Sequence, residues 1–384
     1  MSRLSEGDRQ RIGELFDRQL EVGLHHGAQC AVYVDGRLEI DLAGGVMGLN
    51  KDDACDVDVE PTTPETRHVL FSCTKPYAAT ALHALVDDGE LEYDDPVVDH
   101  WPSFAEEGSA KATITVRQIL SHTAGLPYGE IDQRPDLWGD WDAVIEMLEE
   151  MEPIFTPGTQ PAYHSLTFGW LVGELVRRVS GRPIEAVAAD RVFEPLEMDD
   201  TGIGLRDDED DPVATLTGFA PFDSCRELEE GLGNHAEVAE SFNDEAIHRS
   251  VIPAANGIGT ARDMARFYAC LANGGELDGT RVLEPDSVEA MTTLWAATDE
   301  DGTLHRPSRY GLGVWKGGTS ADPFGSLTPS RVFGHAGLGS SVGWADPERN
   351  VAFSYVTNGV REETYEHITR VSTLADAVRL ALEQ

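Results

Sequence analysis

Strand-forming segments lie near both ends of this chain, and helical segments fill the region between them. Residues 28–48 form two runs rich in β-forming side chains around an Asp-Gly pair at 35–36, the pattern of a β-hairpin. Similar runs return between residues 310 and 359, in "YGLGVWKG", "RVFGHAGLGSSVGWADP" and "VAFSYVTNG". This order predicts one α/β domain built from both ends of the chain, with a mostly helical region inserted.

Apolar residues at spacings of three and four mark the expected helices. They predict helices over residues 5–24, 72–88 and 364–382, the second ending at Gly89. Residues 50–66 are acidic and rich in Pro and Thr, and residues 206–250 are acidic with few apolar anchors. We expect both of these segments to be loops.

The chain carries 69 acidic and 29 basic residues, which gives a net charge of −40. A small soluble domain ordinarily carries a net charge of roughly 2–8 in magnitude. Repulsion among so many negative charges destabilises the compact state. At about 1 M salt the Debye length falls to roughly 3 Å, and the salt screens most of this repulsion. The composition is therefore typical of a halophilic protein in a salt-rich cytoplasm. Its charge also has the wrong sign for a nucleic-acid partner.

The five cysteines are scattered and odd in number, and no C-x-x-C pair occurs, which favours reduced thiols in a reducing compartment. The first residues, "MSRLSEGDRQRIGELF", are polar and lack the apolar core of a signal peptide. The sequence contains no run of about 18 apolar residues, so no membrane helix is expected. We therefore expect a soluble, cytoplasmic protein with no membrane partner; its oligomeric state stays open.

Lys75 is unusual because the chain has only four lysines, and this one lies in the apolar stretch "HVLFSCTKPYAAT". Ser72 precedes it by three residues, so the two side chains share one face if a helix begins near Ser72. Pro76 supports that start, since proline is tolerated in the first turn of a helix. Ser72 would then lie at the positive end of the helix, where developing negative charge is favoured.

This pair has the chemistry of an activated nucleophile. A serine hydroxyl attacks poorly until a base takes its proton, and burial disfavours the charged form of a lysine, leaving a neutral amine. The simpler alternative is that Ser72 only caps the helix while Lys75 reaches solvent. The scarcity of lysine and the Pro-fixed helix start favour the catalytic interpretation of S-x-x-K.

Two further segments carry candidate site residues. Tyr163 stands just before a helical pattern, where a phenol near Ser72 could act as a base; the alternative is a half-buried tyrosine bonded to backbone. Gly334 to Gly339 let the backbone approach a ligand and offer an N–H to an oxyanion, with His335 facing the site. The alternative for His335 is a surface turn.

The segment "GSSVG" (339–343) matches G-x-S-x-G, the nucleophile elbow of α/β-hydrolases. That motif requires a strand, a sharp turn and then a helix. Here the following residues have the pattern of strand and hairpin, so Ser341 is predicted not to be a nucleophile.

Together these motifs resemble the serine β-lactamase and penicillin-binding-protein superfamily, in particular its class C β-lactamase-like branch and the family VIII carboxylesterases. The resemblance covers about residues 25–360. The matching stretches are "SCTK" (72–75), "YHS" (163–165), "HAG" (335–337), "ILSHTAGLP" (119–127), "PLEMDDTGIG" (195–204) and "GHAGLGSSVGWADP" (334–347).

The resemblance implies a β-lactamase-like α/β (α+β) fold, with an antiparallel sheet flanked by terminal helices. Residues 1–78 and 255–384 would form the α/β domain and residues 79–254 the helical domain, with the active site in the cleft between them. Ser72 would be the acylated nucleophile, and Lys75 and Tyr163 would share general-base and general-acid work. The backbone N–H groups of Ser72 and Leu338 would form the oxyanion hole. Such enzymes need no metal and no cofactor.

Two departures from the family pattern bear on the substrate. Ser165 replaces the Asn of the Y-x-N motif, and His335 and Ala336 replace the Lys and Thr of K-T-G. Contacts that would hold the amide and the carboxylate of a β-lactam are thereby lost, which resembles the esterase members. Gly337 would border the substrate, and an apolar acyl or alcohol pocket could be lined by Trp138, Trp315, Trp141 and Tyr128, although ordinary packing explains each of them equally well.

We therefore predict a serine hydrolase that cleaves small-molecule carboxylic esters through an acyl-enzyme on Ser72. A β-lactamase or D,D-peptidase, and a D-amino-acid amidase or aminopeptidase, are alternative enzymes. A non-catalytic ligand sensor on the same fold is an alternative of another class, which the combination of Ser72, Lys75 and Tyr163 disfavours because a binding module needs no base.

Overall fold

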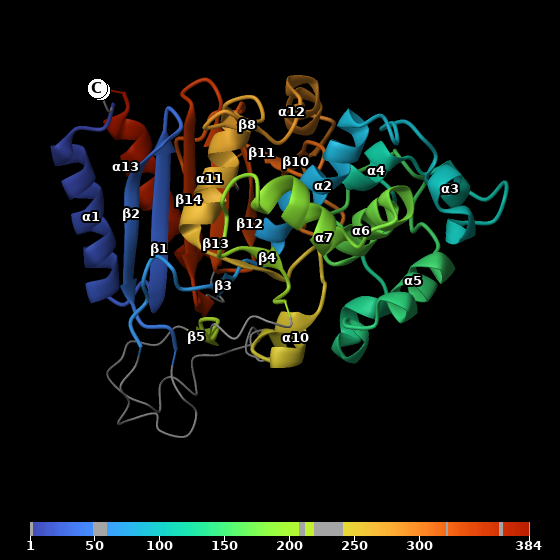
Figure 1. Cartoon of the computed structure of the whole chain (residues 1–384), viewed down its shortest axis with the longest axis horizontal. Helices are drawn as coiled ribbons and strands as arrows, with labels where there is room; N and C mark the ends of the chain where they lie inside the picture. Colours follow the sequence, from blue (N-terminus) through green and yellow to red (C-terminus); the bar gives the residue numbers. More distant parts are fainter. Residues whose placement is uncertain are drawn as a thin grey trace.

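The main sheet joins strands from both ends of the chain (Figure 1). The computed structural model describes residues 3–48, 60–206, 212–218, 241–319, 322–360 and 364–383. In spatial order the eight strands of this sheet are β2 (Arg37–Gly45), β1 (Gly27–Val34), β14 (Val351–Thr357), β13 (Ser341–Asp346), β12 (Phe333–Gly337), β11 (Trp315–Lys316), β10 (Ser308–Tyr310) and β9 (Ala296–Thr298). Every neighbouring pair runs antiparallel.

Smaller sheets and helices fill the rest of the described chain. The short strands are β3 (His68–Val69), β6 (Gly257–Gly259) and β4 (Gly202–Ile203) in one sheet, β5 (Thr217–Gly218) with β15 (Gly359–Val360), and β7 (Glu276–Leu277) with β8 (Thr280–Arg281). The helices are α1 (Glu6–Glu21), α2 (Lys75–Asp87), α3 (Val97–His100), α4 (Val116–Leu120), α5 (Trp141–Glu150), α6 (Thr167–Ser180), α7 (Ile184–Ala188), α10 (Glu245–Arg249), α11 (Ala261–Ala272), α12 (Pro285–Thr292) and α13 (Thr364–Ala381).

The sheet separates two apolar clusters. On one face, α1 and α13 lie side by side and cover alternate residues of β1, including Cys30 and Val32. On the other face, α11 packs against β1, β13 and β14, where Ala31 and Tyr33 point. This second cluster continues without a break into α2 and α6 of the helical region. The boundaries expected at residues 78 and 254 stay a prediction.

The hairpin and the terminal helices agree with the sequence. Strands β1 and β2 are joined at Asp35 and Gly36, which have φ values of 50° and 73°, as a tight hairpin turn requires. The first helix begins after Ser5, whose side chain accepts the Asp8 backbone N–H in a capping box. The last helix was expected over 364–382 and ends one residue earlier, at Ala381.

Two predictions need correction, and others concern segments outside the described residues. Ser72 does not open the α-helix; it begins a 3₁₀ turn, Ser72–Thr74, and α2 starts at Lys75. Within the expected loop 206–250, Glu245–Arg249 forms a helix, because Asp244 caps it by accepting the Ala246 N–H. Most of that loop, most of the loop 50–66, and Cys55 and Cys225 lie outside the described residues.

The described cysteines, Cys30, Cys73 and Cys270, are buried free thiols. No helix in the described ranges combines the length and the apolar content needed to cross a bilayer.

Candidate active site

The turn that carries Ser72 is held in an unusual backbone conformation. Phe71, the residue before it, has φ 46° and ψ −133°, a backbone conformation that residues other than glycine rarely adopt. Hydrogen bonds on both sides hold the turn: Ser341 Oγ donates to Leu70 O at 2.6 Å, and Gly257 N donates to Thr74 Oγ1 at 2.6 Å. The strain therefore persists because strands β13 and β6 fix the turn.

Ser341, the serine of the "GSSVG" segment, has a structural task in this turn. It lies in β13, is 1% exposed, and its hydroxyl donates to the loop before Ser72. The prediction that "GSSVG" is not a nucleophile elbow is confirmed, because a strand follows the serine instead of a helix.

Lys75 is fully buried and placed against the Ser72 hydroxyl. Its Nζ lies 3.0 Å from Ser72 Oγ and donates to Ala254 O, also at 3.0 Å. Burial moves the pKa of the ammonium well below its ordinary value, and the negative charge of Asp132 opposes this shift only in part. The amine at this position is therefore suited to accept a proton from Ser72.

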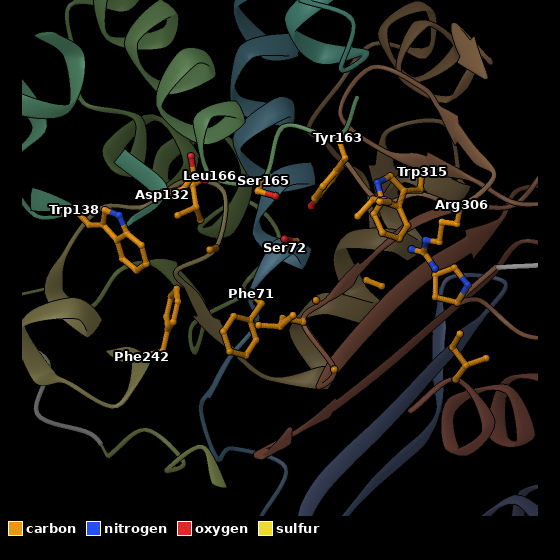
Figure 2. Close-up of a pocket in the computed structure, with 18 residues that line it drawn as sticks. Phe71, Ser72, Asp132, Trp138, Tyr163, Ser165, Leu166, Phe242, Arg306 and Trp315 are labelled. Carbon is orange, nitrogen blue, oxygen red and sulfur yellow. The ribbon is translucent and has the colours of Figure 1, made fainter. Parts of the chain in front are cut away.

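The phenol of Tyr163 points toward the Ser72 hydroxyl (Figure 2). Its ring centroid is 4.9 Å from Lys75 Nζ, and its Oη has no hydrogen-bond partner among the described residues. Burial raises the pKa of the phenol, an effect that the nearby Ser72 hydroxyl offsets only in part. A phenol with a raised pKa stays protonated at neutral pH and can pass its proton on.

A cavity of about 550 Å³ adjoins Ser72. Figure 2 shows Phe71, Phe242 and Trp138 along one side of the serine. The ring centroids of Phe71 and Phe242 are 5.0 Å apart, and those of Trp138 and Phe242 are 5.8 Å apart. Trp138 is fixed by its indole N–H, which donates to Ile131 O at 2.8 Å. This side of the cavity is an aromatic wall suited to an apolar group.

The opposite side of Ser72 combines aromatic rings with a positive charge (Figure 2). The rings of Tyr163 and Trp315 meet edge to face at 5.5 Å, and the Arg306 guanidinium carbon lies 5.2 Å from the centroid of Trp315. Among the described residues that line the cavity, Arg306 is the only lysine or arginine. The two ends of the cavity therefore differ in charge.

The two backbone N–H groups expected to form an oxyanion site are those of Ser72 and Leu338. Ser72 and Leu338 both line the cavity, and neither donates its backbone N–H to another described residue. A substrate oxygen would supply the missing acceptor.

The structure brings most of the predicted site residues to the cavity. Besides Ser72 and Tyr163, the residues Trp138, Trp315, Ser165, Gly337 and Leu338 line it. Lys75 lies behind the Ser72 hydroxyl and is not part of the lining. Tyr128 and Trp141 do not: the first is 50% exposed, and the indole of the second donates to Glu174 at 2.9 Å.

The His335 side chain does not reach the cavity wall. It is fully buried behind Trp315, with ring centroids 4.5 Å apart. Its Nδ1 lies 2.8 Å from Ala336 O. Burial keeps the pKa of the His335 imidazole well below its ordinary value. The ring is neutral, so it does not replace the cation of a K-T-G motif.

Sequence reasoning did not single out Asp132, Phe242 or Arg306, all of which line the cavity. Phe242 follows a long acidic stretch, and Asp132 and Arg306 resemble the many other charged loop residues. No local spacing marks them, because their positions depend on contacts between distant segments.

Gly337 leaves no room for a side chain. A Cβ there would lie 2.1 Å from Ser341 Oγ and 2.5 Å from Leu70 O. We expect Gly337→Ala to displace the Ser72 turn, destabilising the fold by about 1–3 kcal/mol and lowering kcat/KM by roughly 10²-fold. Urea unfolding and steady-state kinetics measure both effects.

Gly13→Ala is the matched control, since a Cβ at Gly13 in α1 would meet only Leu42 Cδ2, at 3.9 Å. It should leave activity unchanged and stabilise the helix slightly. Wild-type kinetics in Gly337→Ala would show that close packing at this glycine does not support the site.

No group of three or more His, Cys, Asp or Glu residues in the described part of the chain is arranged to hold a metal ion.

Comparisons with known proteins agree with this arrangement. The Beta-lactamase family model matches residues 14–376. The esterase/beta-lactamase LipL of Mycobacterium tuberculosis is 34% identical over 351 residues, covering 86% of this chain and 77% of LipL. A penicillin-binding-protein homolog from Caulobacter crescentus superimposes with a TM-score of 0.81 at 31% identity, and a family VIII carboxylesterase with 0.81 at 28%; each alignment covers 98% of both chains.

The fold and the serine–lysine turn define a serine hydrolase of the β-lactamase and penicillin-binding-protein superfamily. Within it, the match over residues 14–376 shows that this chain belongs to the Beta-lactamase family. The predicted β-lactamase-like fold and the predicted enzyme class are thus confirmed.

Proposed function

We propose that the protein cleaves carboxylic esters of small molecules through an acyl-enzyme on Ser72. The observation that carries this proposal is the buried Lys75 amine, 3.0 Å from Ser72 Oγ, beside a cavity of about 550 Å³ with an aromatic wall. The amine supplies a base, and the wall offers a site for an apolar acyl or alcohol group.

The proposed first half-reaction begins when Lys75 Nζ takes the hydroxyl proton of Ser72. Oγ bonds to the ester carbonyl carbon, and the resulting oxyanion accepts the N–H groups of Ser72 and Leu338. The carbon–oxygen bond to the alcohol then breaks. Tyr163 protonates the leaving oxygen and is reprotonated by Lys75, so the alcohol departs and the acyl group remains on Ser72.

The second half-reaction reverses these roles. Water attacks the acyl carbon, passing its proton to Lys75 through Tyr163, and the bond to Ser72 Oγ breaks as that oxygen regains a proton. The products are the carboxylic acid and the free serine. In this scheme Lys75 is the principal base, because its pKa is lowered while the pKa of Tyr163 is raised.

Residue differences around Ser72 support an ester over a β-lactam. Ser165 and Ala336 line the cavity in place of the amide and hydroxyl expected in a β-lactamase, and His335 supplies no cation. The similar structures include a family VIII carboxylesterase, which strengthens the ester assignment.

One observation favours a second candidate. Arg306 brings a positive charge to the cavity wall, and a β-lactam or a peptide ending in D-alanine carries a carboxylate that such a charge would bind. LipL is described as an esterase/beta-lactamase. A β-lactamase or D,D-peptidase activity is therefore the alternative that the experiment must separate.

The test compares hydrolysis of p-nitrophenyl acetate and butyrate with hydrolysis of nitrocefin, in molar KCl. We expect kcat/KM for the esters to exceed that for nitrocefin by at least about 10²-fold, because the β-lactam contacts are missing. Preferential turnover of nitrocefin would contradict the ester assignment. Activity on neither, with no labelling by a fluorophosphonate probe, would favour a ligand sensor.

A further inference from the structure

Asp301 is a fully buried carboxylate that the proposed reaction does not use. It precedes β10 and has no exposed surface. Among the described residues no lysine or arginine forms an ion pair with it. A buried carboxylate without an opposite charge is costly unless hydrogen bonds satisfy both oxygens. The hydrogen bonds that offset the cost of burying this carboxylate therefore have to be identified.

Both oxygens are satisfied, and the donors come from three different segments. Oδ1 accepts the backbone N–H of Tyr163 at 3.0 Å and those of Thr303 and Leu304 at 2.9 Å each. Oδ2 accepts the hydroxyl of Tyr310 at 2.7 Å. One side chain thus joins the segment of the proposed proton carrier to the turn 302–306 and to β10.

The turn held by Asp301 forms part of the cavity wall. Arg306 O accepts the Asp301 N–H at 3.0 Å, and Asp301 O accepts the His305 N–H at 3.0 Å, so the turn closes on itself. Leu304 and Arg306 project from it into the cavity, beside Tyr163. Asp301 Oδ1 is therefore a shared anchor for the backbone of Tyr163 and for this wall.

The Tyr163 ring is held by packing, whereas its polar atoms have few partners. Its hydroxyl makes no hydrogen bond within the described structure. The ring packs against four others, with centroid distances of 4.9 Å to His122, 5.5 Å to Trp315, 5.9 Å to His335 and 6.5 Å to Tyr310. The segment around it is held by two bonds to His122, from Ala162 N to its carbonyl and from His164 N to its Nδ1, both at 3.0 Å. The backbone N–H of Tyr163 itself is held by Asp301 alone.

We propose that Asp301 is a positioning residue of the active site: it fixes the Tyr163 phenol and the Leu304–Arg306 wall relative to Ser72. This inference rests on the proposed function, since it gives Tyr163 a chemical task. Asp301 touches no reacting atom; it acts through the backbone of Tyr163.

A double-mutant cycle with Tyr163→Phe tests the proposal, with the rate of Ser72 labelling by a fluorophosphonate as the readout. Asp301→Ala should slow labelling by roughly 10²-fold in the wild-type background, the effect of misplacing a catalytic group by about 1 Å. In the Tyr163→Phe background the same change should cost less than about 3-fold, because no hydroxyl remains to be positioned.

Asp301→Asn is the second variant, and it keeps the test valid if the alanine variant does not fold. Its amide oxygen can accept the three N–H groups and its NH₂ can donate to Tyr310, so labelling should stay within about 10-fold of wild type. Thermal unfolding monitors the fold of each variant.

Each outcome of the cycle has a defined meaning. Equal losses in both backgrounds would show that Asp301 only supports the fold, and would overturn the proposal. Failure of Asp301→Asn to retain labelling, in folded protein, would also overturn it. If wild-type Ser72 were not labelled at all, the proposed function would fail and the role of Asp301 with it, a result distinct from an additive cycle.

Discussion

A Ser72→Ala variant is expected to lose kcat/KM for p-nitrophenyl esters by roughly 10⁴-fold or more, the scale at which removal of a catalytic nucleophile acts. Without Oγ no acyl-enzyme can form, and the Lys75 amine has no proton to accept. The loss should fall on kcat, because the aromatic wall of the cavity is untouched. Stopped-flow or plate-reader kinetics in molar KCl measure it.

The matched control is Ser103→Ala, an exposed serine whose hydroxyl donates to Glu149 at the surface of the helical region. Its kinetics should equal those of the wild type. Mass spectrometry of protein treated with a fluorophosphonate should find the adduct on Ser72. Full ester turnover in Ser72→Ala would place the nucleophile elsewhere and contradict the acyl-enzyme mechanism.

Lys75→Met should lower kcat/KM by roughly 10²–10⁴-fold, the usual contribution of a general base. Wild-type activity should also fall on the acid side, as pH drops through the lowered pKa of Lys75, because only the neutral amine accepts the Ser72 proton. The residual activity of the variant should lack this limb. A pH–rate profile of both proteins measures the difference.

The same substitution has an expected signature in stability. Burial gives Lys75 a lower pKa in the folded than in the unfolded state, so between those values the unfolded state binds more protons. The wild-type free energy of unfolding should therefore rise with pH relative to that of Lys75→Met in this window. Urea unfolding at several pH values tests the sign.

Lys111→Met is the control for both measurements. This lysine is also buried, and its Nζ donates to the carbonyls of Leu148 and Glu149 at the end of α5. Burial lowers its pKa to about 8. The variant should be destabilised because these carbonyls lose their donor, but its kcat should not change. An equal loss of kcat in both variants would mean that buried lysines matter here only for folding.

Local sequence rules predicted the elements that depend on neighbouring residues. The Asp35–Gly36 turn and the helix that follows Ser5 depend on contacts within a few residues, so hairpin and helix appear where expected. The proximity of Ser72 and Lys75 was also predictable, because one turn of chain brings their side chains to 3.0 Å.

The cavity wall was not predictable in the same way. Phe242, Arg306 and Asp301 reach the site from segments that are far apart in sequence and have no periodic pattern. His335 illustrates the converse: its place in a motif suggested a residue facing the substrate, but tertiary packing turned the ring behind Trp315. A sequence motif predicts which backbone segment lies near a site. The direction in which a side chain of that segment points depends on tertiary packing around the sheet.

The pairing of β1 with β14 has a consequence for biosynthesis. Residue 34 of the first strand pairs with residue 351, so the two partners are 317 positions apart in the sequence. At about 5–20 residues per second on a ribosome, β1 waits on the order of tens of seconds for its neighbour. Throughout that time an apolar strand has an open edge. The net negative charge of the chain would then keep nascent molecules apart through mutual repulsion. The acidic composition would thus limit aggregation before folding is complete.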